Sequence, residues 1–79
     1  MAEQKIKQDI PIGANIRELR RRQKIGQTEL VRLLQLEGVA MTRETLVKIE
    51  RGTQHIQASQ LRGLRNALHT TYDALLAER

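Results

Sequence analysis

From Ile12 onward, hydrophobic residues recur at the spacing of an α-helix. Ile12, Ile16 and Leu19 share one helix face, and Gly26 interrupts the pattern. The stretch QTELVRLLQLEG continues as a second helix, which Gly38 is expected to end because glycine readily takes the left-handed conformation. The apolar residues of this second helix include Leu30, Val31, Leu33 and Leu34.

Three further helices follow from their end signals. Thr42 is a suitable N-cap for a third helix that runs through Arg51, with Gly52 as its stop. A fourth helix is expected at about 58–69 and a fifth at about 71–78, each with an apolar face. The inward residues of the fourth helix are Leu61, Leu64, Ala67 and Leu68, and the apolar residues of the fifth are Tyr72, Leu75 and Leu76. No stretch predicts a β-strand, so the sequence indicates an all-α domain of five short helices.

Residues 1–11, MAEQKIKQDIP, precede the helical pattern and are mostly polar. We expect a flexible or frayed N-terminal arm ahead of a domain at 12–79. The alternative is an arm that lies along a nucleic acid or a partner subunit.

Two charged side chains border the apolar faces of neighbouring helices. At 100° per residue, Glu50 lies within about 40° of Leu46, so its carboxylate points toward the core. Arg20 lies about 40° from Ile16 and borders the core in the same way. An unpaired buried charge is strongly destabilising, and a guanidinium can bind a carboxylate through two hydrogen bonds. We therefore expect a structural Arg20–Glu50 ion pair; the alternative is that both side chains extend into water.

The composition favours a polyanionic partner. The 79 residues carry 14 Lys and Arg against 9 Asp and Glu, a net charge of +5, which favours nucleic acid. Tyr72 is the single aromatic residue, so the chain lacks the stacking surfaces that read single strands. The run Arg20–Arg22 with Lys24 is expected to act by long-range attraction, because its members point to different sides of the helix.

Several other classes of protein are disfavoured. The sequence has no cysteine, and the isolated His55 and His69 lack the partners of a zinc site, so we expect neither a metal nor another cofactor. It has no glycine-rich phosphate loop or nucleophile motif, and we expect no enzyme. No apolar run approaches the ~18 residues of a membrane span. The cytoplasm is the expected location.

Four stretches together resemble the helix-turn-helix domains of the lambda-repressor and Cro type, the XRE family. They are IRELR at 16–20, GQTEL at 26–30, TLVKIERG at 45–52 and LRNALHTTYDALL at 64–76. The resemblance covers nearly all of the chain outside the arm. It implies a five-helix fold, double-stranded DNA as partner and a bacterial or phage origin. It also implies an arginine–glutamate pair between the first and third helices, in agreement with the geometric argument.

The connection LQLEGVAM departs from the family pattern because it is longer than is usual there. We expect the second helix to gain a turn, with Leu36, Val39 and Met41 beneath it. This difference bears on how the third helix is presented.

The third helix carries the residues expected to read DNA. Arg43, Glu44, Val47 and Lys48 lie opposite its apolar face, and in the resembling family the first residues of this helix contact base edges. Glu44 has the alternative of pairing with Lys48, four residues later.

Phosphate contacts are expected from helix starts, where backbone N–H groups attract anions, and from the loop after the third helix. The candidates are Gln27, Thr28, Thr42, Arg51, Thr53 and Gln54. Gln27 matches a glutamine that touches the DNA backbone in the resembling family. Thr53 has the alternative of capping its own loop.

The leading hypothesis is a transcriptional regulator, a repressor that binds duplex DNA sequence-specifically as a homodimer. The fifth helix, with Tyr72, Leu75 and Leu76, is the expected dimer seam; these residues have the alternative of only closing the core. A second hypothesis is a protein-interaction module on the same fold, such as an antitoxin or antirepressor-like partner. The outward charged residues favour DNA over such a partner. A third hypothesis is coating of nucleic acid by charge alone.

Overall fold

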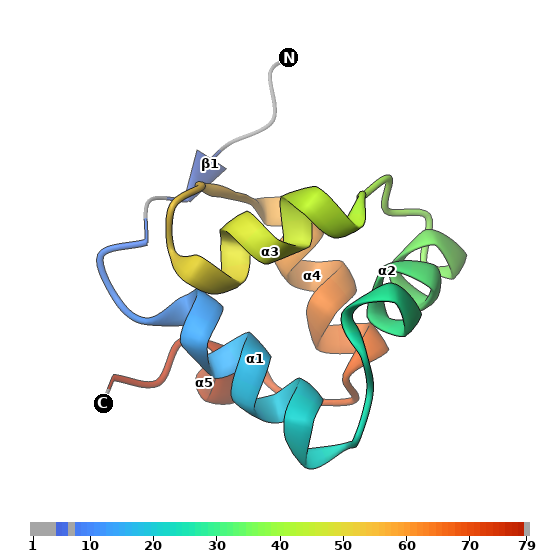
Figure 1. The fold of residues 1–79 in the computed structure, drawn as a ribbon. Coiled ribbons are helices and arrows are strands. Elements are labelled where there is room, and N and C mark those ends of the chain that lie inside the picture. Colours follow the sequence, from blue (N-terminus) through green and yellow to red (C-terminus); the bar gives the residue numbers. More distant parts are fainter. Residues whose placement is uncertain (1–4, 7, 79) are drawn as a thin grey trace.

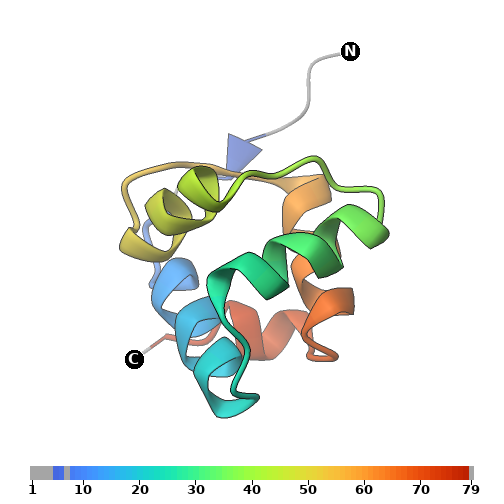
Figure 2. The same cartoon turned by 45° about the vertical axis from the view of Figure 1, so that its right-hand side comes forward.

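The computed structural model describes residues 5–6 and 8–78. This part of the chain contains five helices and a two-stranded antiparallel ribbon, joined by short loops (Figure 1). The helices are α1 (Ile12–Arg22), α2 (Gln27–Leu36), α3 (Arg43–Arg51), α4 (Ala58–Ala67) and α5 (Tyr72–Leu75). The strands are β1 (Lys5–Ile6) and β2 (Ile56–Gln57). In the turned view α4 lies behind α2, and α1 and α3 lie together beside this pair (Figure 2).

The sequence signals correctly predict the end of α2, both ends of α3 and the start of α5. The Thr42 hydroxyl oxygen accepts a hydrogen bond from the Thr45 backbone N–H at 3.1 Å, which caps α3. Thr71 caps α5 in the same way. Gly38 and Gly52 have φ values of 81° and 78°, a left-handed conformation that suits glycine because it has no Cβ.

The end of α1 comes earlier than the hydrophobic pattern predicts. Its last residue is Arg22, and Lys24 takes the left-handed conformation with φ 58°. The Ile25 N–H then donates to the Arg20 carbonyl at 3.1 Å, and the Ile25 side chain packs against the core. Gly26, which we expected to break the first helix, has φ −77° and is the N-cap of α2. The turn that brings Ile25 to the core therefore ends α1 before the glycine.

One hydrophobic core joins the helices. Its largest fully buried side chains are Ile12, Ile16, Leu30, Leu34, Leu46, Ile49, Ile56, Leu64, Leu68 and Leu75. Burial of aliphatic surface is the main stabilising contribution in such a domain, because the chain has no cysteine for a disulfide.

The short helix α5 contributes one side chain, Leu75, to this core. Leu75, which we expected at a dimer seam, is fully buried, so the expectation is wrong for this residue. Tyr72 and Leu76 each keep 37% of their surface exposed. The helix ends at Leu75, before the expected residue 78, and the amide of Asn15 donates to the carbonyls of Leu75 and Ala77 at 2.9 and 2.8 Å.

The long connection between α2 and α3 packs only in part as predicted. Met41 is buried, and Val39 packs against the core beside Gly63 of α4, where a Cβ atom would crowd it. Leu36 is 78% exposed, so its expected place beneath the helix is wrong. The reason is geometric: two residues after the buried Leu34, the helix has turned by about 200°.

The structure contains an antiparallel ribbon where the sequence predicted no strand. Lys5 pairs with Gln57, and Ile6 pairs with Ile56. The prediction is wrong because two-residue strands are too short to show a periodic pattern. Residues 5–6 and 8–11, part of the expected arm, thus belong to the described structure; residues 1–4 and 7 of that arm lie outside the described residues.

The helices α1 and α3 come into backbone contact at Gly13. A Cβ atom at this position would overlap the carbonyl oxygen of Ile49 in α3. Only glycine leaves room for this approach. The N-terminal end of α1 therefore sets the position of the C-terminal end of α3 (Figure 1).

Candidate nucleic-acid interface

An ion pair between α1 and α3 lies at the centre of the candidate site. The Arg20 guanidinium donates from Nε to Glu50 Oε2 at 2.8 Å and from Nη2 to Glu50 Oε1 at 3.0 Å. Both residues are buried, with 9% of the surface of Arg20 and 8% of that of Glu50 exposed. The expected pair is therefore present, and its two parallel hydrogen bonds fix both the separation and the rotation of the helices.

Two neighbouring groups add hydrogen bonds to this pair. Arg20 Nη1 donates to the Ile25 carbonyl at 2.9 Å, and Gln27 Nε2 donates to Glu50 Oε1 at 3.1 Å. We expected Gln27 to contact a DNA phosphate, whereas in the structure its amide nitrogen is directed to Glu50. The pair and Gln27 thus join α1, α2 and α3 at one polar centre. No sequence spacing indicated this second partner for Glu50.

The outer face of α3 carries the residues expected to read DNA. Arg43, Glu44 and Lys48 are exposed and Val47 is partly exposed, while the opposite face packs into the core. Glu44 and Lys48 form no ion pair in the described structure, so the alternative suggested by their spacing is not realised. The side chains of this face are therefore available to an external partner.

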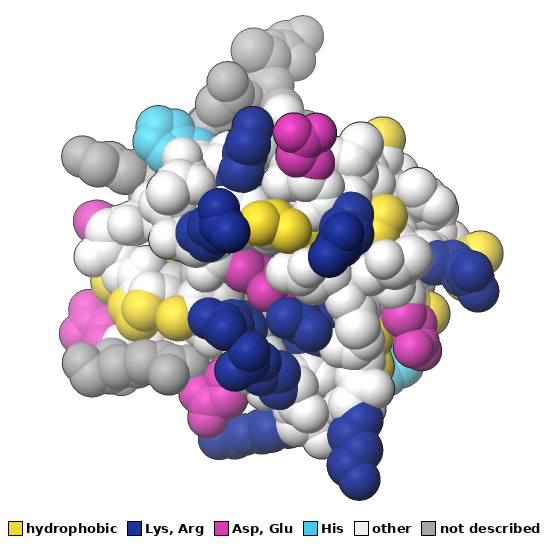
Figure 3. Space-filling model, in the orientation of Figure 1, with side chains coloured by type: hydrophobic (Ala, Val, Ile, Leu, Met, Phe, Trp, Pro, Cys, Tyr) yellow, Lys and Arg dark blue, Asp and Glu magenta, His cyan; other side chains and the backbone are white. Residues whose placement is uncertain are grey.

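Arginines from α1 and α3 surround an open depression beside the ion pair. Its outer lining is Arg17, Arg21, Gln27, Arg43, Val47 and Arg51, and the buried Arg20 and Glu50 also contribute to it. Lys and Arg side chains gather on this side of the molecule, over α1 and α3 (Figure 3).

Sequence reasoning missed Arg17 and gave Arg21 only a long-range role. Both residues line the depression together with Arg43 of α3. The available signal was their spacing of four residues, which places them one above the other on the same side of α1.

Two of the threonines expected at phosphates use their hydroxyls within the protein. Thr42 caps α3, and Thr53 donates from Oγ1 to the Lys48 carbonyl at 3.2 Å, which is the capping alternative noted from the sequence. Thr28 is exposed in the first turn of α2, and Gln54 is partly buried. Contacts of these residues with phosphate stay a prediction.

Comparison with known proteins identifies the fold. No family model matches the sequence, and no curated protein matches it. Among solved structures, the chain is similar to the restriction-modification controller protein C.AhdI from Aeromonas hydrophila, with a TM-score of 0.73 and 24% sequence identity. The alignment covers 84% of this chain and 92% of that chain. The chain has an all-α helix-turn-helix fold.

The helix-turn-helix fold confirms the fold class predicted from the sequence. Its two-helix unit is α2 and α3, joined by residues 37–42. Within this unit α2 packs against α4, and α3 packs against α1 through the ion pair and Gly13. The second helix of the unit is thus held from behind and presents its charged face outward.

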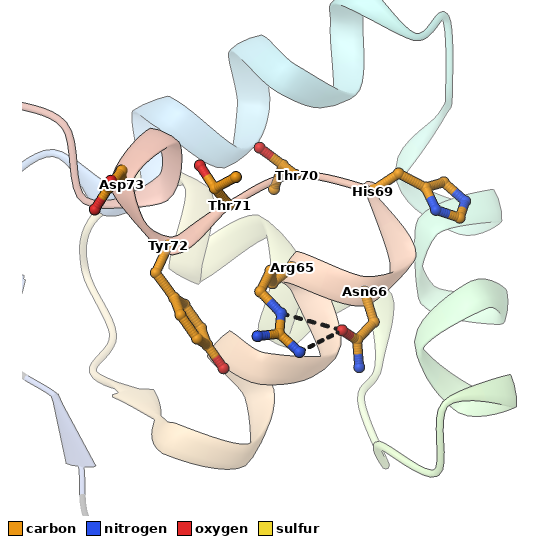
Figure 4. A pocket seen from close by; sticks show the side chains of 7 residues that line it. All are labelled: Arg65, Asn66, His69, Thr70, Thr71, Tyr72 and Asp73. Carbon is orange, nitrogen blue, oxygen red and sulfur yellow. Dashed lines mark hydrogen bonds between the residues drawn. The ribbon is translucent and has the colours of Figure 1, made fainter.

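A further depression lies between α4 and α5 (Figure 4). The Arg65 guanidinium carbon is 4.6 Å from the centroid of the Tyr72 ring, and Nε and Nη2 of Arg65 donate to Asn66 Oδ1 at 3.1 and 2.9 Å. This stacking is an attractive cation–π contact. One face of Tyr72 is therefore covered within the chain, which reduces the apolar surface left at the expected dimer seam.

The two histidines are exposed and lie outside the helices. In residues 5–6 and 8–78, no three His, Cys, Asp or Glu side chains gather closely enough to hold a metal ion.

In the same part of the chain, every helix is too short or too polar to cross a membrane.

Proposed function

We propose that the protein binds double-stranded DNA sequence-specifically and regulates transcription as a repressor. The observation that carries this proposal is the exposed basic face of α3, fixed from behind by the buried Arg20–Glu50 pair. The fold shared with a restriction-modification controller protein supports a regulatory role. The charged character of the face favours DNA over a protein partner, which would more often meet an apolar patch.

In this proposal α3 enters the major groove. The groove is about 12 Å wide and admits one helix with its side chains. Arg43 and Lys48 can donate hydrogen bonds to O6 and N7 of guanine, and Glu44 can accept one from N4 of cytosine. Val47 can contact the methyl group of thymine. These four positions supply the discrimination between base pairs.

The flanks of α3 are proposed to hold the DNA backbone. Arg17 and Arg21 from α1, together with Arg51 at the end of α3, continue the positive charge along the depression. The first turns of α2 and α3 add backbone N–H groups that favour anions. The other proposed phosphate contacts are Gln27, Thr28, Thr42, Thr53 and Gln54.

We also propose a homodimer, because one such unit reads only half of a DNA site. Two copies would present their α3 helices about 34 Å apart along one face of the duplex. Tyr72 of α5 and Leu76, directly after that helix, are the exposed apolar residues that remain for this interface. Analytical ultracentrifugation of the protein on its selected DNA should give two copies per site, and one copy per site would contradict the dimer.

Binding to selected and random duplexes over a range of salt concentrations tests the proposed function. A specific regulator should bind its selected site about 10³-fold or more tightly than random DNA at physiological salt. Equal affinity for both would reject sequence-specific regulation and leave binding by charge alone. No measurable DNA binding at low salt would favour the protein-interaction hypothesis.

Replacing Arg43 with alanine should relax sequence preference at one position of the site. Loss of a guanine contact should reduce discrimination there by about 1–3 kcal/mol, measured as the affinity ratio between the selected site and its single-base variants. Arg62→Ala on α4 is the matched control, since it removes the same charge at an exposed residue outside this face. An equal loss on every sequence would remove Arg43 from the base-reading set.

Replacing Arg21 with alanine should weaken binding to all duplexes alike. Loss of one phosphate contact should lower the slope of log affinity against log salt by about one. Titrations of one random duplex at four or five salt concentrations measure this slope, with Arg62→Ala again as control. If the two variants gave the same slope, Arg21 would not contact a phosphate.

A further inference from the structure

The side chain of Gln8 connects two parts of the chain that are distant in sequence: the start of α1, and the end of α3 with the loop after it. Its Nε2 donates to the carbonyl of Ile49 at 3.1 Å and to the carbonyl of Gln54 at 2.6 Å. Its Oε1 accepts a hydrogen bond from the Gly13 N–H at 2.9 Å. The side chain is partly buried, so these hydrogen bonds are shielded in part from water.

The three partners of Gln8 are backbone groups at a helix start, at a helix end and in the loop after that helix. The Gly13 N–H is in the first turn of α1 and has no acceptor within that helix. The Ile49 carbonyl is in the last turn of α3, where it accepts from the Gly52 N–H at 3.0 Å as well as from Gln8. The Gln54 carbonyl is in the loop that follows α3. One amide therefore holds the start of α1, the end of α3 and that loop together.

Gln8 is itself held in place on both sides. Before it, β1 pairs with β2, just beyond the loop that contains Gln54. After it, Ile10 packs against the core, and the Ile12 N–H donates to the Ile10 carbonyl at 2.7 Å. The glutamine is therefore a fixed point of contact and not a side chain at the end of a free segment.

We propose that Gln8 is a positioning residue for DNA recognition, which fixes the end of α3 and the following loop against α1. Arg51 and Thr53, both proposed at phosphates, lie between its two carbonyl acceptors in the sequence. Without Gln8, this segment gains freedom that specific binding must remove again, whereas random DNA tolerates a looser fit. This inference rests on the proposed function and names the residue that aligns its site.

Affinities of Gln8→Ala for selected and random duplexes test the inference. We expect the ratio of the two affinities to fall about tenfold, because one to two hydrogen bonds of ordinary strength correspond to that factor. Gln8→Met is the second variant, since it keeps most of the side-chain volume but no strong donor or acceptor. It should give a similar fall if the hydrogen bonds, and not packing, are responsible.

Gln23→Ala is the matched control for a merely structural role. Gln23 Nε2 donates to the Leu68 carbonyl at 2.6 Å, so this amide also joins two distant segments, but at the end of α1 that lies away from Gly13. Thermal melting of all three variants shows whether they fold. Gln23→Ala should lose stability without a change in the affinity ratio. An unchanged ratio for Gln8→Ala, or an equal fall for Gln23→Ala, would overturn the inference.

Hydrogen exchange of the free protein separates this inference from the proposed function. In Gln8→Ala the backbone amides of Gly52 and Thr53, which donate to carbonyls of the last turn of α3, should exchange about tenfold faster. If the wild type does not distinguish selected from random DNA, the proposed function fails. Faster exchange in that case still supports Gln8 as the residue that fixes α3, and unchanged exchange overturns it.

Discussion

The Arg20→Ala variant is expected to lose about 3 kcal/mol of unfolding free energy, a large share of the stability of so small a domain. The substitution leaves the Glu50 carboxylate buried without the guanidinium that donates to both of its oxygens. It also frees the Ile25 carbonyl from Arg20 Nη1. Among the residues that the structure describes, Gln27 then remains as the donor to Glu50, and a single neutral amide does not replace a charge. Urea denaturation followed by circular dichroism measures the loss.

Arg22→Ala provides the control for Arg20→Ala within the same helix. Arg22 donates to Glu18 at 2.7 Å, but the two side chains are 70% and 43% exposed, so removing this pair should cost about 0.5 kcal/mol or less. Similar losses for both variants would show that Arg20 and Glu50 are solvated. Replacing Arg20 and Glu50 together with Met and Leu should recover much of the loss, since no unpaired charge then stays buried.

The Gly13→Ala variant is expected to destabilise the fold by roughly 3 kcal/mol through overpacking. The new methyl group would overlap the Ile49 carbonyl oxygen, and backbone atoms of two helices must move to relieve that overlap. Any such movement also shifts Glu50 of α3 relative to Arg20 of α1. Under the proposed function, the variant should therefore lose specific DNA binding at temperatures where it is still folded, measured by affinity for the selected duplex.

Gly26→Ala is the control for the glycine substitution. Gly26 has φ −77°, and a Cβ atom there would have no neighbour within 4 Å. Alanine should change stability by less than about 1 kcal/mol at such a site. If Gly13→Ala were as stable as Gly26→Ala, the close approach of α1 and α3 at Gly13 would not exist in solution.

The sequence was sufficient to predict the fold because its signals are local or periodic. Thr42, Gly38 and Gly52 act within one or two turns of the chain, and helical spacing places the core leucines of the fourth helix, Leu61, Leu64 and Leu68. The pairing of Arg20 with Glu50 could be predicted because a charge beside a helix's apolar face requires a partner. The sequence therefore contained both the order of the helices and the contact that orients α3.

The missed features depend on the three-dimensional arrangement and have no periodic signal. Gln8 donates to two carbonyls, and Gln27 to one carboxylate, that are more than twenty positions away. In the sequence alone, nothing distinguishes these two from the chain's other glutamines. Leu75 was expected at the surface and is buried, whereas Leu36 was expected to be covered and is exposed. An apolar residue near a helix end can face either the core or the solvent. Arg17 became visible only once α1 was placed against α3.

The residues that hold α3 in the fold lie on one face of the helix, and its exposed charged residues lie on the other. Leu46, Ile49 and Glu50 are buried and hold the helix, whereas Arg43 and Lys48 are exposed and are not needed for that purpose. Substitutions at exposed positions usually change folding free energy by less than about 0.5 kcal/mol. Under the proposed function, the DNA target can therefore change over evolution, one base pair at a time, on a scaffold that stays the same.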